Sequence, residues 1–287
     1  MHRLPEYFLE DKIRVLVVGC GGTGSAIASG LVYLHHALIA RGHPHGLRVT
    51  VQDGDVITAA NCVRQPFSVS DIGLNKAVLL VTRINAFWGL DWHAEDFHLV
   101  ANSGIEAHIV IGCVDTRAAR RTIEQVTRAQ EVNYWLDLGN RADDGQFLLG
   151  QPPGTAPDSR RLRTIAEEWP ELLDPKLDDD TLPSCSALEA LTRQGPFINQ
   201  VLANHALALL SRLFLKGETL HRGAFVNLVS GRVAPIFVPP APVLSIEDER
   251  EIRMCAASGC APEVLMDAFG LDEVEFRQIT ARRNRAA

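Results

Sequence analysis

Short apolar runs recur through the first half of the chain, and each ends in glycine or in polar residues. They predict strands at 13 to about 19, 47–53, 92–99, 108–114 and 134–139. Apolar residues at helical spacing lie between them and predict helices from Gly24 into the thirties, at 73–87 and at 115–129. Strands that alternate with helices predict a Rossmann-like, doubly wound, mostly parallel sheet of the α/β class.

The second half has a different pattern. Residues 151–195 are rich in proline and acidic residues and have little periodicity, which predicts a long crossover loop. An apolar helix follows at 196–215, and residues 222–238 resemble a hairpin with a Ser230-Gly231 turn. We therefore divide the chain into a Rossmann-like half (1–150), the crossover loop (151–195), a helix and hairpin that complete the same domain (196–240), and a helical C-terminal extension (241–287).

Composition and charge exclude several classes of protein. The 46% hydrophobic and 22% charged residues are ordinary for a soluble domain. A net charge of −7 gives no basic footprint for nucleic acid, and no apolar run is long enough for a membrane span or resembles a signal peptide. The six cysteines include no CxxC pair, which favours a reduced, cytoplasmic protein.

A glycine-rich turn follows the first strand in the order Gly19-x-Gly21-x-x-Gly24. Glycines let the backbone approach a phosphate, and the free N–H groups of the following helix attract the anion. The turn is not a P-loop, because Ser25 stands where the phosphate-binding lysine would be. Asp53 closes the next strand, as the acidic residue of a dinucleotide fingerprint does. Alone, these features favour an NAD-dependent oxidoreductase.

The polar residues after Asp53 favour a different chemistry. Asp55 is followed by the run Asn61-Cys62-Val63-Arg64-Gln65, then by Lys76, and Asp115 follows the strand at 108–114. A site for a nucleoside triphosphate needs cations for the phosphates and a carboxylate for magnesium, whereas hydride transfer needs neither.

This ordered set resembles the ThiF/MoeB/HesA family of adenylating enzymes, which is related to the ubiquitin-activating enzymes. Its parts are Gly-x-Gly-Gly-x-Gly-Ser at 19–25, Asp-x-Asp at 53–55, Asn-x-x-Arg-Gln at 61–65, and Lys76 after Gly73. The resemblance covers about residues 10–150 and recurs at 183–237. One departure is Asp115-Thr116, where the family usually has Asp-Asn.

The resemblance implies ATP-dependent adenylation of the C-terminal carboxylate of a small ubiquitin-like or sulfur-carrier β-grasp protein by a homodimeric enzyme. It assigns Asn61, Arg64 and Lys76 to catalysis and Asp115 to Mg²⁺. The implied ATP-binding residues are Gly19, Gly21, Gly22, Gly24, Ser25, Asp53, Asp55, Arg64, Gln65 and Lys76.

Cys185 is a second catalytic candidate, because related enzymes that form a thioester place a cysteine in a comparable crossover loop. Its surroundings, Pro183-Ser184-Cys185-Ser186 and the following Glu189-Ala190-Leu191, resemble ThiF-family proteins of the bacterial PRTRC systems. A thiolate there would take the acyl group from the adenylate. Relatives often carry two CxxC pairs for zinc, and because this chain has none we expect no zinc.

Three alternatives stay open at this stage. An NAD-dependent Rossmann oxidoreductase would use the same glycine turn. A relative that adenylates a small carboxylate on tRNA would use the same phosphate chemistry, although the acidic net charge disfavours that substrate. A catalytically silent binding protein is disfavoured by the joint presence of Arg64, Lys76 and Asp115.

Overall fold

A computed structural model describes residues 1–155, 161–178, 195–240, 244–269, 271 and 273–281. Along the chain the elements are β1 (His2–Arg3), the 3-10 helix η1 (Glu6–Leu9), β2 (Ile13–Val18), α1 (Gly22–Ala40), β3 (Leu47–Gln52), η2 (Asn61–Val63), η3 (Val69–Asp71), α2 (Lys76–Trp88), β4 (His93–Glu95), β5 (Ile109–Gly112), α3 (Arg117–Ala129), β6 (Tyr134–Asn140), β7 (Asp144–Gly150), α4 (Ile165–Glu168), η4 (Pro170–Leu172), η5 (Pro175–Leu177), α6 (Ile198–Lys216), β8 (Glu218–Thr219), β9 (His221–Asn227), β10 (Arg232–Phe237), α7 (Ile246–Ala257), α8 (Pro262–Phe269) and α9 (Glu273–Ala281).

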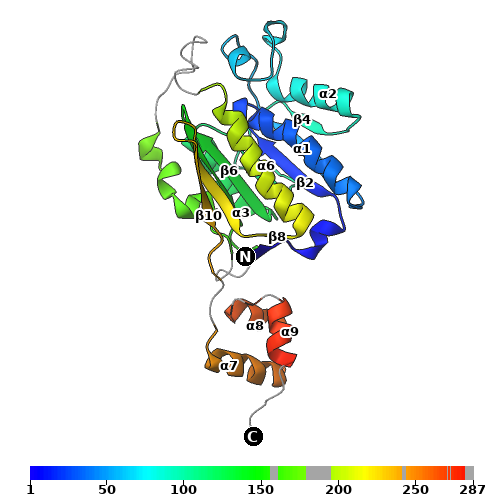
Figure 1. Ribbon diagram of the computed structural model, residues 1–287, viewed down its shortest axis with the longest axis vertical. Coiled ribbons are helices and arrows are strands. Elements are labelled where there is room, and N and C mark those ends of the chain that lie inside the picture. Colours follow the sequence, from blue (N-terminus) through cyan, green and yellow to red (C-terminus); the bar gives the residue numbers. More distant parts are fainter. Residues whose placement is uncertain (156–160, 179–194, 241–243, 270, 272, 282–287) are drawn as a thin grey trace.

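The fold is a three-layer α/β arrangement around a sheet whose eight strands, among the described residues, run in the order β10-β9-β7-β6-β5-β2-β3-β4. The pairs from β4 to β6 are parallel, and those from β6 to β10 are antiparallel. Helices α1, α2 and α6 cover one face, and α3 and α4 cover the other (Figure 1). The predicted Rossmann-like, mostly parallel sheet is confirmed.

One predicted strand is much shorter in the structure, and one strand was not predicted. The strand predicted at 92–99 is shorter and covers only His93–Glu95, at the sheet edge. Strand β7 was not predicted, because its sequence begins with polar residues and has only three consecutive apolar positions, Phe147 to Leu149. It forms where β6 on one side and β9 on the other supply hydrogen-bonding partners, which are not local in sequence.

Helices α1 and α6 pack closely because glycines of α1 leave room for side chains of α6. A Cβ at Gly30 would come within 2.2 Å of the Leu207 side chain, and one at Gly22 within 2.4 Å of Asn199. Both helices also bury apolar side chains in the same core. This packing joins the helix predicted at 196–215 to the nucleotide-binding half of the fold.

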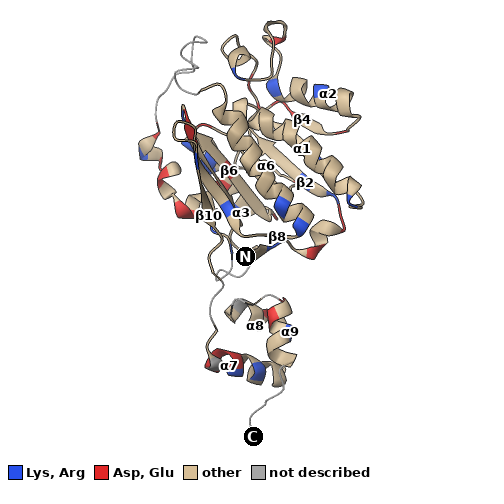
Figure 2. Cartoon of the chain, in the orientation of Figure 1, with Lys and Arg blue, Asp and Glu red and all other residues tan. Residues whose placement is uncertain are grey.

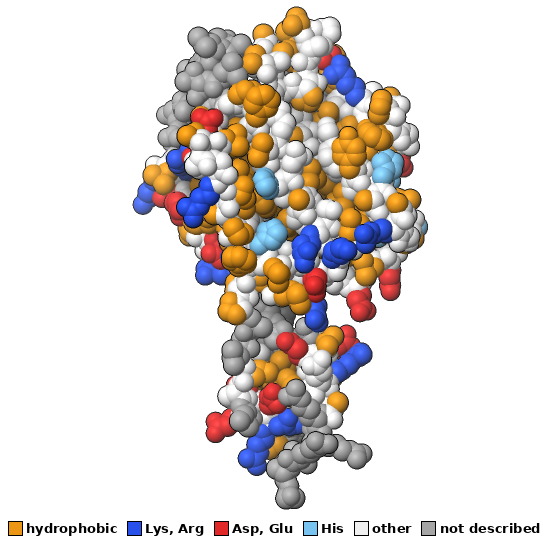
Figure 3. All heavy atoms as spheres, viewed as in Figure 1, with side chains coloured by type: hydrophobic (Ala, Val, Ile, Leu, Met, Phe, Trp, Pro, Cys, Tyr) orange, Lys and Arg blue, Asp and Glu red, His pale blue; other side chains and the backbone are white. Residues whose placement is uncertain are grey.

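The last helices, α7 to α9, pack on one another around Ile252, Leu271 and Ile279, and they lie below the sheet in Figure 1. Within the described residues, no helix is both long and apolar enough to span a bilayer. On the face covered by α1 and α6, charged side chains gather toward the lower edge, near the C-terminal end of α6 (Figures 2 and 3).

Candidate functional site

The glycine turn connects β2 tightly to α1. Gly19 has a positive φ of 92°, which favours glycine, and a Cβ at Gly24 would lie 1.8 Å from the carbonyl oxygen of Gly19. Helix α1 begins after Gly21 with no side-chain cap and no acidic residue in its first turn. Its N-terminal N–H groups and the positive end of its dipole are therefore suited to an anion.

A cavity of about 860 Å³ opens at this turn and extends over the carboxyl ends of the strands to the antiparallel half of the sheet. Its size is in the range of small-molecule sites. The polar and glycine residues that line it include Gly19, Gly21, Gly22, Thr23, Asp53, Asp55, Arg64, Gln65, His98, Asp115, Arg117, Arg120, Asn140, Arg141, Asp144, Gln146, Asn199, Asn227 and Arg232.

Asp53 lies at the end of β3 and is buried. One of its carboxylate oxygens accepts a hydrogen bond from the backbone N–H of Cys20 at 2.5 Å, and the other accepts from the N–H of Asp55 at 2.8 Å. Asp53 thus holds the glycine turn beside β3. This structural role was not predicted, and a second lone pair on each oxygen leaves it able to accept from a ligand hydroxyl.

Arg64 and Gln65 come from the loop after η2 and Asp115 from the loop after β5, and all three line the cavity. Burial lowers the pKa of the Arg64 guanidinium, and the nearby carboxylate of Asp115 opposes that shift. Arginine stays protonated in proteins, so Arg64 presents a positive charge at this wall. A cation and an exposed carboxylate therefore face the same space as the glycine turn.

Lys76 is buried, and its Nζ donates to Asp55 Oδ2 at 2.7 Å. Asn61 accepts hydrogen bonds from the N–H and the hydroxyl of Thr58. The Ser25 hydroxyl donates to the Gly22 carbonyl within the first turn of α1. These three residues and Gly24 are close to the lining residues in sequence, but they do not line the cavity themselves.

A divalent cation could be held at either of two places, by Asp115 or by the group of Asp53, Asp55 and His98. Asp115 lies on the cavity wall, and Mg²⁺ commonly takes only one or two protein carboxylates together with phosphate oxygens, so this residue fits the predicted metal role. Asp53, Asp55 and His98 each place one ligand atom within 4.8 Å of the other two. Lys76 already pairs with Asp55, and its positive charge offsets part of the negative charge of this second group.

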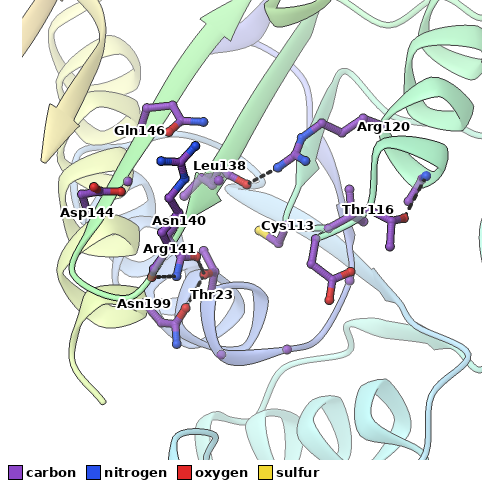
Figure 4. A pocket seen from close by; sticks show the side chains of 18 of the residues that line it. Thr23, Cys113, Thr116, Arg120, Leu138, Asn140, Arg141, Asp144, Gln146 and Asn199 are labelled. Carbon is purple, nitrogen blue, oxygen red and sulfur yellow. Dashed lines mark hydrogen bonds between the residues drawn. The ribbon is translucent and has the colours of Figure 1, made fainter. Parts of the chain in front are cut away.

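Asn140 and Asn199, which line the cavity from β6 and α6, were not predicted as site residues. Thr23 Oγ1 lies 2.9 Å from Asn199 Oδ1 and 3.2 Å from Asn140 Oδ1, and Figure 4 shows the three side chains together. Asn140 could have been found from its position just after a predicted strand. Asn199 is a polar residue on an otherwise apolar helix face, which is a weaker signal.

A buried ion pair lies beside the same cavity. Arg120 Nε is 3.2 Å from both carboxylate oxygens of Asp137. The Nη2 of Arg120 donates to the Leu138 carbonyl at 3.4 Å (Figure 4). Burial raises the pKa of Asp137, and the positive charge of Arg120 opposes that rise. The pair joins α3 to β6 below the cavity.

The cysteines near the turn are poorly suited to nucleophilic chemistry. Burial raises the pKa of Cys20 and of Cys113 well above the ordinary thiol value, and the neighbouring carboxylates Asp53 and Asp137 add to the respective shifts. A thiolate is the reactive form, so both are expected to be inert. Cys185, the predicted nucleophile, lies outside the described residues.

The fold and this cavity define a Rossmann-like α/β protein with a nucleotide-type anion site at the carboxyl edge of its sheet. The model of the ThiF family matches residues 9–213, and the chain therefore belongs to the ThiF family. This membership supports an adenylyltransferase. No curated protein sequence is significantly similar to the chain.

Solved structures share the fold. The crystal structure of PaaA has a TM-score of 0.54 and 14% identity, with 81% of this chain and 66% of PaaA covered. Escherichia coli MccB with ATP has a TM-score of 0.51 and 19% identity, with 84% and 68% covered, and MccB with MccA gives 0.53 at the same identity. The chain thus spans about two thirds of the length of these proteins.

Proposed function

We propose that this protein adenylates the C-terminal carboxylate of a small ubiquitin-like or sulfur-carrier protein with ATP. The observation that carries the proposal is the convergence of the uncapped N-terminus of α1, Arg64 and Asp115 on one cavity. They correspond to the separate motifs of the ThiF family, to which the chain belongs.

The reaction needs little covalent help from the protein. The substrate carboxylate is already ionised, so it attacks the α-phosphorus without a general base. The new bond joins the carboxylate oxygen to the α-phosphorus, the bond to the β-phosphate oxygen breaks, and pyrophosphate leaves. The barrier arises from bringing two anions together and from the charge of the leaving group, both of which fixed positive charge lowers.

Arg64 supplies that charge at the cavity wall. Lys76 would contribute a second charge once its Nζ moves from Asp55 Oδ2 to a phosphate, and Asn61 would orient the phosphates or the incoming carboxylate. The glycine turn and Gln65 would hold ATP, with the carboxylates of Asp53 and Asp55 near the ribose. Asp115 would hold Mg²⁺, which neutralises phosphate charge when bound.

The substrate class rests on the family resemblance and on the structural neighbours. MccB has been solved with MccA, which supports a protein or peptide as the carboxylate donor. We favour a protein with an extended C-terminus, because the cavity continues from the turn over the antiparallel strands β6, β7, β9 and β10. The cavity therefore extends beyond the part that the glycine turn forms.

After adenylation, the Cys185 thiolate would attack the carbonyl carbon of the adenylate, forming a thioester and releasing AMP. The enzyme would act in the cytoplasm as a homodimer. Size-exclusion chromatography with light scattering tests the homodimer. We propose the four-part division of the chain, with 1–150 as the adenylation half, from the same family resemblance.

ATP–pyrophosphate exchange with a small β-grasp protein tests the proposal. We expect exchange by the wild type and a loss of about 100-fold or more in Arg64→Ala, because fixed charges at such sites contribute at least that much. Arg48→Ala, an exposed arginine of β3 outside the cavity, is the matched control. Absence of exchange in the wild type with every β-grasp partner would reject the proposal.

Cys185→Ala separates the two steps. Exchange should continue in this variant, while a thiol-sensitive covalent adduct should form only with the wild type. If the wild type also forms no adduct, the enzyme adenylates its substrate without forming a thioester.

A further inference from the structure

The side chain of Asn199 has an unusual position for an amide. It lies in the first turn of α6 and is 1% exposed, among apolar residues of the α1–α6 contact. Its Oδ1 lies 2.9 Å from the Thr23 hydroxyl, whereas its Nδ2 has no hydrogen-bond partner within the part of the chain that the structure describes. A buried donor without a partner is costly, and in native folds such a group commonly bonds a water or an ion or has a functional role.

The unpartnered nitrogen lies beside the glycine turn. Nδ2 is 2.4 Å from the place where a Cβ of Gly22 would be, so only a glycine at position 22 lets the amide approach the start of α1. Asn199 also lines the cavity together with Gly21, Gly22 and Thr23 (Figure 4). The donor therefore stands next to the N-terminal N–H groups of a helix that has no side-chain cap.

The Thr23 hydroxyl orients the amide by donating its single proton to Asn199 Oδ1, the nearer of two amide oxygens. The Thr23 hydroxyl faces the oxygens of both asparagines, and the Nδ2 of Asn140 donates to the Arg141 carbonyl. Asn140 thus has one of its two amide N–H groups bonded, whereas Asn199 Nδ2 has no partner for either N–H among the described residues. The groups just named, the Thr23 hydroxyl, the two amides and the Arg141 carbonyl, are uncharged and include no carboxylate, although Asp115 and Asp144 line other parts of the cavity.

From this geometry we infer that Asn199 Nδ2 and the N-terminus of α1 together bind one anionic oxygen of the reacting adenylate group. The inference rests on the proposed adenylation and extends it to α6, beyond the motif residues. The oxygen belongs either to the α-phosphate or to the carboxylate that attacks it. In both cases Asn199 would fix the two reactants relative to each other.

Three ligands distinguish these sources without the protein substrate. Adenosine lacks an anionic group, AMP has the phosphate alone, and 5′-O-(N-glycylsulfamoyl)adenosine mimics an acyl adenylate. Binding of each would be measured by calorimetry for the wild type, Asn199→Leu and Asn199→Asp. Leucine removes the donor and has a similar volume. Aspartate keeps an oxygen toward Thr23 and places an acceptor where Nδ2 was, so Asn199→Asp tests the site even if Asn199→Leu impairs folding.

We expect both variants to bind adenosine like the wild type and to bind the acyl-adenylate mimic at least about tenfold more weakly, as for a lost hydrogen bond to a charged group. A parallel loss for AMP would assign the oxygen to the α-phosphate. Unchanged AMP binding would assign it to the acyl group. Asn204→Leu, at an exposed position of the same helix, is the matched control and should change none of the three affinities.

Two results would overturn the inference alone: unchanged affinity of both variants for the mimic, or an equal loss for adenosine, which indicates a purely structural role. Failure of the wild type to bind AMP and the mimic would instead overturn the proposed function, and the inference with it.

Discussion

At the scale of single residues, Asp53 connects the glycine turn to β3 through two backbone hydrogen bonds. Asp53→Asn removes the charge and turns one acceptor into a donor that faces an N–H group. We expect the free energy of unfolding to fall by about 1–3 kcal/mol and the affinity for AMP to fall as well, because the turn loses a hydrogen bond to β3. Urea unfolding and calorimetry measure the two effects, with the exposed Asp96→Asn as control. Unchanged stability would show that the turn holds without Asp53.

Arg120 and Asp137 form the second residue-scale test. Arg120→Met leaves a buried carboxylate without its partner and is expected to cost about 3–5 kcal/mol of unfolding free energy. Replacing both residues, as in Arg120→Met with Asp137→Leu, removes the stranded charge and should recover most of that loss. A double-mutant cycle in urea measures the coupling. Equal costs for the single and double variants would argue against a coupled pair.

At the scale of elements, two glycines of the β2–turn–α1 unit differ in what an added side chain would meet. A Cβ at Gly24 would meet the Gly19 carbonyl, whereas a Cβ at Gly21 meets nothing within 4 Å. Gly24→Ala should therefore destabilise the fold by at least about 3 kcal/mol, and Gly21→Ala by less than about 1 kcal/mol. Thermal unfolding compares the two. Equal destabilisation would mean that conformational freedom matters more than space.

The start of α4 has a capping box whose stability depends on pH. Arg161 first, and then the N–H of Thr164, lower the pKa of Glu167 from 4.5 to about 2, against the opposing effect of burial. Because this pKa is lowered in the folded state, the ionised Glu167 stabilises the fold above pH 4.5, and that stabilisation is lost as the pH falls toward about 2.

Glu167→Gln removes that dependence. At neutral pH we expect the free energy of unfolding of the wild type to exceed that of the variant by about 1 kcal/mol, because solvent screens a partly exposed carboxylate. The difference should vanish near pH 2. Denaturant unfolding at a series of pH values measures it. A difference that stayed constant with pH would attribute the effect to packing instead.

At the scale of the whole molecule, α7 to α9 have an apolar cluster of their own, separate from the two clusters of the sheet. A chain of residues 1–240 should therefore fold and bind AMP, with a thermal midpoint within about 4 °C of the full chain. Calorimetry of both chains measures this. Loss of the folding transition would show that the C-terminal helices are part of the main folding unit.

The sequence alone predicted the parallel half of the fold and one wall of the cavity. Strand and helix periodicities are local, and the glycine turn, Asp53, Arg64 and Asp115 follow or connect elements that those periodicities locate. The motifs also identified the family, because their order along the chain is itself sequence information. Ligand residues placed at strand ends then had to meet at one sheet edge.

The tertiary structure alone decided how the antiparallel half completes the site. Strand β7 needs its neighbours β6 and β9 to form, and Thr23 meets Asn199 across 176 positions of sequence. Neither the position of Asn199 Nδ2 over Gly22 nor the pairing of Arg120 with Asp137 has a local signature. Such contacts depend on how whole helices pack on a sheet, which no short sequence pattern specifies.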